Sequence, residues 1–142
     1  MKYCDIQIGM TKEITHLITQ EDVNKFADLT GDDNKLHLDE KYASKTSFKK
    51  PVAHGMLSAS FISTIIGTEI PGDGALWFSQ TIDFLIPVRV GDLITVKATV
   101  LKKDDRNNAI EMSTDIYNQI KIRIIKYFTR INYLITNQWK NF

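Results

Sequence analysis

The chain has 142 residues, of which 43% are hydrophobic and 25% are charged, and this is the composition of an ordinary globular domain that can bury a core. A formal net charge of +1 gives no electrostatic reason to expect nucleic acid or an anionic membrane as a partner. Because no N-terminal stretch resembles a secretory signal and the longest mostly apolar window, residues 56–66, is too short to span a bilayer, we expect one domain over residues 1–142 in the cytoplasm.

The first part of the chain predicts an edge strand followed by one amphipathic helix. Residues 14–18 are β-prone and follow a turn at Gly9. Residues 19–22 have almost the spacing of a capping box, with aspartate as its acidic member. Apolar residues then recur from Val23 at the spacing of one buried helical face, and Gly31 is expected to end the helix.

An aspartate and a histidine, Asp32 and His37, stand five residues apart in the polar segment that follows. Turn-forming residues surround them, among them Asn34, so both side chains are predicted on an exposed loop before a short helix at residues 39–44. A carboxylate and an imidazole are the commonest pair for moving protons near neutral pH. Taken alone, however, the segment is better explained as a solvated connection between two helices.

A later segment predicts a helix that is buried on every side. From Gly55 to Ile66 no residue is charged and nearly all are apolar or small, which is typical of a helix enclosed by other elements. The backbone N–H groups at a helix start are unpaired and carry the positive end of the dipole, so Gly55 could receive a developing oxyanion. The alternative is that Gly55 is only a tight entry to the helix. We interpret His54 as a helix-entry residue rather than a catalyst.

The apolar pattern changes to period two after residues 71–74. Alternate residues from 76 to 86 share one predicted strand face, with Gln80 as its only polar member, and similar strands follow over residues 94–100 and 110–116. Long antiparallel strands with one apolar face need a cover, and the predicted helix supplies it. The expected fold is α+β, with a curled antiparallel sheet wrapped around a long central helix.

The tail after Gln119 is less regular than the preceding strands. Isoleucines alternate from Ile120 to Ile124, but from Ile125 onward the apolar residues fall on the other parity. A strand with this pattern needs a bulge, because a slip of one residue turns every side chain to the opposite face. The polar residues beyond residue 137 suggest a frayed end.

Three motifs stand out once these elements are placed. They are Phe-Ala-Asp-Leu-Thr-Gly-Asp-Asp-Asn-Lys-Leu-His over residues 26–37, Pro-Val-Ala-His-Gly-Met-Leu over residues 51–57, and Pro-Val-Arg-Val-Gly-Asp over residues 87–92. With them the chain resembles the (R)-specific enoyl-CoA hydratases, the MaoC-like dehydratase group of the hot-dog fold, over about residues 5–119. Residues 120–142 lack the glycine and small residues of the last strand of that family.

The resemblance implies reversible addition of water to the 2,3 double bond of a trans-2-enoyl-CoA, giving an (R)-3-hydroxyacyl-CoA, with no cofactor and no metal. Asp32 and His37 would hold the water and exchange its protons, either of them acting as the base, and the Gly55 N–H would stabilise the thioester oxygen. A hot-dog acyl-CoA thioesterase and a non-catalytic acyl-CoA-binding module are the alternatives, and neither of them needs this pair. The resemblance also implies a homodimer or a larger hot-dog assembly.

The resemblance implies supporting roles for three more residues. Asn34 falls on a motif position and is expected to shape the loop rather than react. Ser63 matches a polar position near the pair, although a helix serine that bonds its own backbone is an equal alternative. Gln80 is expected either to face the acyl pocket or to cap a defect in its strand.

Overall fold

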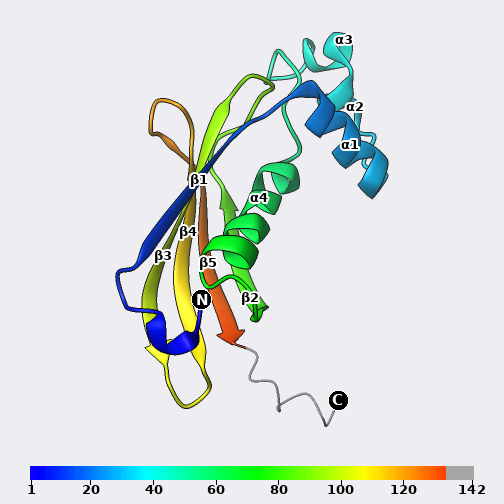
Figure 1. Cartoon of the computed structure of the whole chain (residues 1–142). Helices are drawn as coiled ribbons and strands as arrows, with labels where there is room; N and C mark the ends of the chain where they lie inside the picture. Colours follow the sequence, from blue (N-terminus) through cyan, green and yellow to red (C-terminus); the bar gives the residue numbers. More distant parts are fainter. Residues whose placement is uncertain (134–142) are drawn as a thin grey trace.

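An antiparallel sheet of five strands forms the frame of the described part of the chain, residues 1–133 of a computed structural model (Figure 1). The strands lie in the order β1-β3-β4-β5-β2, and every neighbouring pair is antiparallel. Their bounds are Thr11–Leu17 (β1), Ala75–Phe84 (β2), Leu93–Asp104 (β3), Ala109–Tyr117 (β4) and Arg123–Tyr133 (β5). The predicted N-terminal edge strand is confirmed as β1, and β2 forms the opposite edge.

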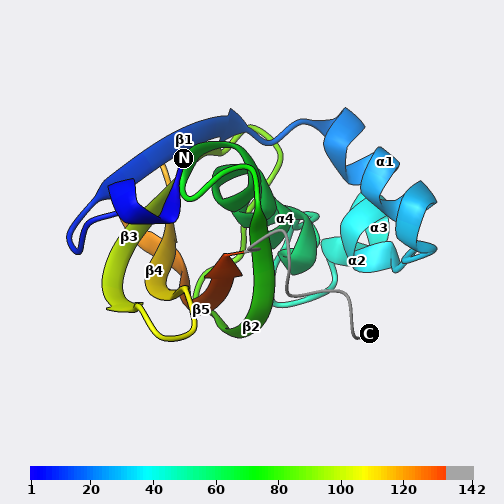
Figure 2. The ribbon, with the colours of Figure 1, turned by 60° about the horizontal axis from the view of Figure 1, so that its bottom comes forward.

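The sheet curls around one helix, α4, which π-helical η2 extends (Figures 1 and 2). Three other helices, α1, α2 and α3, lie together beyond one end of the sheet. The helices comprise η1 (Tyr3–Asp5), α1 (Gln20–Thr30), α2 (Lys35–Leu38), α3 (Glu40–Ala43), α4 (Gly55–Thr64) and η2 (Ile65–Glu69). No helix in residues 1–133 is both long enough and apolar enough to cross a membrane. The predicted α+β arrangement is confirmed.

Helix α1 begins and ends where its sequence predicts. The Asp22 N–H donates to Thr19 Oγ1 at 3.1 Å, and the Thr19 N–H donates to the Asp22 carboxylate at 2.8 Å, so the capping box is complete. Burial raises the pKa of Asp22, but hydrogen bonds from His16 and Thr19 outweigh this effect and hold the pKa below its usual value. Gly31 closes the helix in the left-handed conformation, with a φ of 74°.

The prediction that α4 is buried on every side is wrong for the described chain. One face of the helix, with Leu57 and Ile62, packs into the core, whereas Met56, Ser60 and Ser63 are exposed. Met56 exposes 54% of its surface. Small and hydroxyl-bearing side chains are uncharged whether or not a neighbour covers them, so the absence of charge did not reveal this open face.

Strand β2 changes phase partway along its length. Its register with β5 shifts between Trp77 and Ser79, which leaves Phe78 as a bulge. Ala75 before the bulge and Ile82 after it therefore both pack against the core, although they have opposite parity. The single continuous apolar face predicted for this strand is wrong, because the bulge turns its first residues over.

The irregular tail forms β5, a strand inside the sheet that pairs with β4 on one side and β2 on the other. Ile124 and Ile125 are both buried, and the register with β4 is irregular at this point. The predicted change of parity is therefore confirmed, and a bulge absorbs it. After the bulge Tyr127 and Ile131 are buried. The frayed end expected beyond residue 137 lies outside the described residues.

Candidate active site

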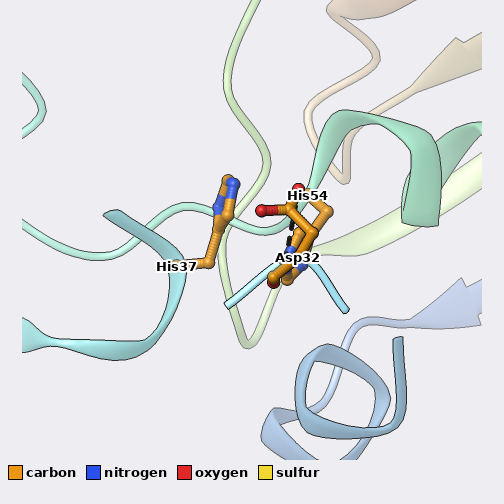
Figure 3. A group of neighbouring side chains, drawn as sticks. All are labelled: Asp32, His37 and His54. Atoms are coloured by element: carbon orange, nitrogen blue, oxygen red, sulfur yellow. Dashed lines mark hydrogen bonds and ion pairs between the residues drawn. The ribbon is translucent and has the colours of Figure 1, made fainter. Parts of the chain in front are cut away.

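Asp32, His37 and His54 come together from three separate elements (Figure 3). Asp32 follows α1, His37 lies in α2, and His54 immediately precedes α4. One oxygen or nitrogen atom of each side chain lies within 4.8 Å of the corresponding atoms of the other two. The predicted pair is therefore close in space, and a second histidine joins it.

A hydrogen bond determines which ring nitrogen of His37 is free. The Nδ1 atom lies 2.7 Å from the backbone oxygen of Val52. Because a carbonyl oxygen can only accept, Nδ1 carries the proton, and Nε2 keeps its lone pair in the neutral ring. The prediction that His37 lies on a loop is wrong, since the residue belongs to the single-turn helix α2.

The loop between α1 and α2 is built by side chains that bond its own backbone. Asn34 Oδ1 accepts a hydrogen bond from the Leu36 N–H at 2.9 Å and caps α2. Asp32 Oδ1 accepts from the Asn34 N–H at 3.4 Å, and the Asp32 N–H donates to Thr30 Oγ1 at 3.3 Å. Asn34 therefore shapes the loop that carries Asp32. The Asp32 side chain remains 51% exposed, so its carboxylate is open to solvent.

His54 lies at the entry to α4, as predicted, and its ring also joins Asp32 and His37. It is only 2% exposed, and its Nε2 lies 2.9 Å from the backbone oxygen of Asp32 and 3.9 Å from the Asp32 carboxylate. Its ring centroid lies 3.9 Å from that of His37 and 5.0 Å from that of Phe26. His54 thus holds the Asp32 loop against His37. Its position directly before Gly55, within the motif at residues 51–57, was the signal of this role in the sequence.

Gly55 begins α4 as predicted and has no room for a side chain. As the first helical residue it has no acceptor for its N–H within the helix. A Cβ added to Gly55 would lie 2.8 Å from Cε1 of Phe84 in β2. The aromatic side chain therefore packs directly against the helix start, and a larger residue at position 55 would force the Phe84 ring or the helix start to shift.

Gly55 and His37 both line two adjoining hollows. One hollow has a volume of 340 Å³, and apart from these two residues and Ser58 its lining is apolar, including Phe48, Val52, Phe84, Ile86 and Ile125. The other has a volume of 410 Å³ and includes Asp32 and His54 in its lining. The His37 imidazole and the helix start thus lie where an apolar hollow meets a hollow that Asp32 and His54 also line.

Arg89, in the third motif, fixes the segment that positions His37. Its guanidinium donates to three backbone oxygens within residues 48–51, at 2.7, 2.8 and 3.0 Å. The next residue, Val52, accepts the hydrogen bond from His37. Because the planar guanidinium presents its donors in a fixed fork, it can hold several carbonyl groups at once. The sequence carried no signal for this contact beyond the motif itself.

Two predicted site residues lie away from this group in the described chain. Ser63 is exposed on α4, roughly two turns after Gly55, and it lines neither hollow. Gln80 in β2 also lines neither hollow, and its buried Oε1 has no hydrogen-bond partner among residues 1–133. The bulge in β2 lies two residues before it, at Phe78, and Gln80 itself pairs regularly with Thr129 of β5. The substrate-supporting roles of both residues stay predictions.

Asp32, His37 and His54 are close enough to share a cation in geometric terms. Each imidazole, however, already directs one nitrogen to a backbone oxygen, and the remaining Nδ1 of His54 is buried. These hydrogen bonds fix the orientation of both rings and leave Nε2 as the one ring nitrogen of His37 without a backbone partner among the described residues. The expectation that the site works without a metal stays a prediction.

Comparison with known proteins finds relatives that are named as dehydratases or hydratases of acyl-CoA compounds. A 3-hydroxybutyryl-CoA dehydratase of Methylorubrum extorquens is 44% identical over 96 residues, which cover 68% of this chain and 61% of that protein. The alignment therefore spans less than two thirds of that relative. An (R)-specific enoyl-CoA hydratase of Rhodospirillum rubrum is 45% identical over 96 residues, covering 68% of this chain and 67% of that protein.

A solved structure and a family match agree with these relatives. The (R)-hydratase PhaJ1 of Pseudomonas aeruginosa, in its unliganded form, is 37% identical to this chain and superimposes with a TM-score of 0.87 over 92% of this chain and 84% of that one. This similarity confirms the hot-dog fold. Residues 6–119 match the family described as MaoC like domain, nearly the extent that the motifs indicated. The chain belongs to the MaoC-like dehydratase family.

Proposed function

We propose that this chain is a hydro-lyase that adds water reversibly to the 2,3 double bond of a trans-2-enoyl-CoA and forms the (R)-3-hydroxyacyl-CoA. The observation that carries the proposal is the meeting of His37 and Gly55 at the junction of the two hollows, with Asp32 beside them. The names of the relatives, enoyl-CoA hydratase and 3-hydroxybutyryl-CoA dehydratase, support the same reaction.

The residues supply what each step of this reaction needs. The water oxygen forms a bond to C3 while its proton passes to the Asp32 and His37 pair, and the C2–C3 π electrons move toward the thioester oxygen. The Gly55 N–H donates to that oxygen as it becomes negative. The pair then returns one proton to C2, so its protonation state is restored. The free Nε2 of His37 suits this exchange, because Nδ1 is already committed to Val52.

The two hollows divide the substrate between them. The acyl chain beyond C3 occupies the apolar 340 Å³ hollow, because its methylene groups gain free energy from burial there. The reacting carbons lie at the junction with the 410 Å³ hollow, within reach of Asp32. His54 does not touch the substrate and acts as a positioning residue for the Asp32 loop.

Hydration of crotonyl-CoA tests the proposal directly. We expect the wild-type chain to decrease the absorbance of the enoyl thioester and to form the (R) product. Asp32→Asn and His37→Ala are each expected to lower kcat/KM by about 10²–10⁴. The matched control is Asp33→Asn, which removes the neighbouring exposed carboxylate and leaves the rate unchanged. Thermal unfolding shows that the variants remain folded.

Three outcomes would contradict the proposal. Full activity in either folded variant would exclude the pair as the proton-exchanging group. Release of free thiol without formation of the 3-hydroxyacyl product would identify a thioesterase. Binding of acyl-CoA with neither reaction would identify a binding module.

We also propose a homodimer that works in the cytoplasm. Strand β2 is an edge strand, and its exposed residues include Phe78 and Phe84, a combination that favours pairing with another strand. Light scattering on a size-exclusion column is expected to report twice the chain mass, and Phe78→Lys is expected to shift it toward the monomer. A monomeric wild-type protein would contradict the first part, and a membrane-associated or organellar fraction would contradict the second.

A further inference from the structure

Ser58 carries the one hydroxyl group in the lining of the apolar 340 Å³ hollow. The residue is 1% exposed, and its Oγ has no hydrogen-bond partner among residues 1–133. A buried hydroxyl without a partner is costly, and native proteins rarely keep one unless a water or a ligand completes it. A water or a polar ligand atom in the hollow that Ser58 lines can supply this partner.

Two other hydroxyl residues of the same helical segment, Ser60 and Thr68, form the backbone hydrogen bond that Ser58 lacks. Ser60 Oγ donates to the Leu57 backbone oxygen at 2.6 Å, and Thr68 Oγ1 donates to the Thr64 oxygen at 2.8 Å. These are the ordinary bonds of helix serines and threonines to the preceding turn. Ser58 does not form such a bond.

The position of Ser58 on α4 shows which part of a substrate it meets. It follows Gly55 by three residues, so both lie on the same side of the helix, about 4.5 Å apart along its axis. Gly55 borders both hollows, whereas Ser58 lines only the apolar one. A thioester oxygen at Gly55 therefore places the reacting carbons at the junction and directs the acyl chain past Ser58.

We infer that Ser58 is a specificity-determining residue of the acyl hollow. It favours acyl chains that allow its hydroxyl group to keep a polar partner, either a water molecule or an oxygen atom of the chain. This inference rests on the proposed hydratase function. A short chain such as crotonyl leaves space in which water can bond Ser58, and a longer chain can do so only if it carries an oxygen there. A long alkyl chain displaces the water and leaves the hydroxyl unpaired, since methylene groups neither donate nor accept.

The test compares Ser58→Ala with wild type on three substrates: crotonyl-CoA, trans-2-octenoyl-CoA, and an octenoyl-CoA with a hydroxyl group on its distal chain. The ratio of kcat/KM for octenoyl-CoA to that for crotonyl-CoA is expected to rise roughly 5- to 150-fold in the variant, because no hydroxyl is stranded any longer. Ser60→Ala is the matched control, since its hydroxyl bonds within the helix, and it leaves the ratio unchanged.

The hydroxylated substrate distinguishes the two sources of the partner. If the chain oxygen bonds Ser58, wild type prefers this substrate to octenoyl-CoA, and Ser58→Ala loses the preference. If only water bonds it, wild type disfavours both long chains, and the variant accepts both.

An unchanged octenoyl-to-crotonyl ratio in Ser58→Ala, with crotonyl-CoA still hydrated, would overturn the inference while leaving the proposed function intact. If wild type hydrates none of the three substrates, the proposed function itself fails. The thermal midpoint without substrate gives a second readout: it is expected to be the same or higher in Ser58→Ala, and a marked decrease would show that the hydroxyl has a partner within the protein.

Discussion

The segment from residue 26 to residue 57 and strand β5 contribute to the molecule in opposite ways. The first segment carries the recognisable motifs and holds Asp32, His37 and His54 in place through hydrogen bonds to backbone atoms. Strand β5 lies outside the family match at residues 6–119, yet it fills the place in the sheet between β4 and β2.

This difference shows that the residues of a candidate active site and the residues of a sheet strand are constrained in separate ways. Proton exchange needs particular side-chain atoms at particular positions, so few residues will serve in the first segment. A strand inside a sheet needs only apolar residues of suitable size on its buried face and a register that suits its neighbours. Strand β5 meets this packing requirement without the glycine and small residues that the last strand of the family usually has. One of its residues, Ile125, also lines the apolar hollow.

The largest effect on stability is expected from the tail. Ile131→Ala removes a fully buried side chain of β5 and should lower the free energy of unfolding by about 2–5 kcal/mol, because the cavity cannot close completely. Urea unfolding measures the change, and Ile120→Ala, at an exposed position, serves as the control. Equal stability of the two variants would show that β5 is not a structural strand.

Apart from the proposed Asp32 and His37 pair, the largest effect on rate is expected at Gly55. Gly55→Ala places a Cβ 2.8 Å from the Phe84 ring, so that the ring or the helix start must shift. Alanine keeps the backbone N–H, but displacement of the helix start moves this donor away from the thioester oxygen and should lower kcat for crotonyl-CoA by about 10²–10³. Gly67→Ala, where an added Cβ meets no atom within 4 Å, is the matched control. If Gly55→Ala keeps full activity, the backbone donor must lie elsewhere.

A smaller effect that depends on pH is expected at the start of α1. Asp22→Asn should lower the free energy of unfolding by about 1–2 kcal/mol at pH 7, because it replaces the charged carboxylate that accepts hydrogen bonds from His16 and Thr19 with a neutral amide. Since the folded-state pKa of Asp22 lies below its usual value, this stabilisation is present above the unfolded-state pKa and is lost as pH falls through the folded-state pKa.

Urea unfolding of wild type and Asp22→Asn from pH 7 down to pH 2 measures this dependence. The difference between the two proteins is expected to close at the acid end of the range. Asp28→Asn on the exposed side of α1 should show no such difference. A gap of constant size at every pH would mean that the charge of Asp22 contributes nothing.

The smallest effect is expected at Tyr127 in β5, and its sign is opposite. Its hydroxyl group is buried without a hydrogen-bond partner among the described residues, and this burial raises the pKa of the phenol. Tyr127→Phe removes the unpaired group and should raise the free energy of unfolding by about 1 kcal/mol. Tyr42→Phe, at an exposed position, is the control, and a loss of stability in Tyr127→Phe would reveal a hidden partner.

Local patterns in the sequence determined the local structure well. The capping box at Thr19, the left-handed Gly31 and the helix start at Gly55 all lie where they were predicted, because each depends on residues within one or two turns of the chain. The change of parity at Ile125 correctly predicted a bulge in β5. The spacing of Asp32 and His37 indicated the pair that the fold then brought together.

Only the tertiary structure decided which distant residues join that pair. His54 joins the site because its Nε2 forms a hydrogen bond with the backbone oxygen of Asp32. Arg89 contributes because its guanidinium binds the backbone oxygens of residues just before Val52. Ser63, in contrast, lies on an exposed face of α4. The bulge in β2 likewise depends on its register with β5. Such contacts join segments that are far apart in the chain, and no local spacing encodes them, because their free energy arises only when the sheet closes around α4.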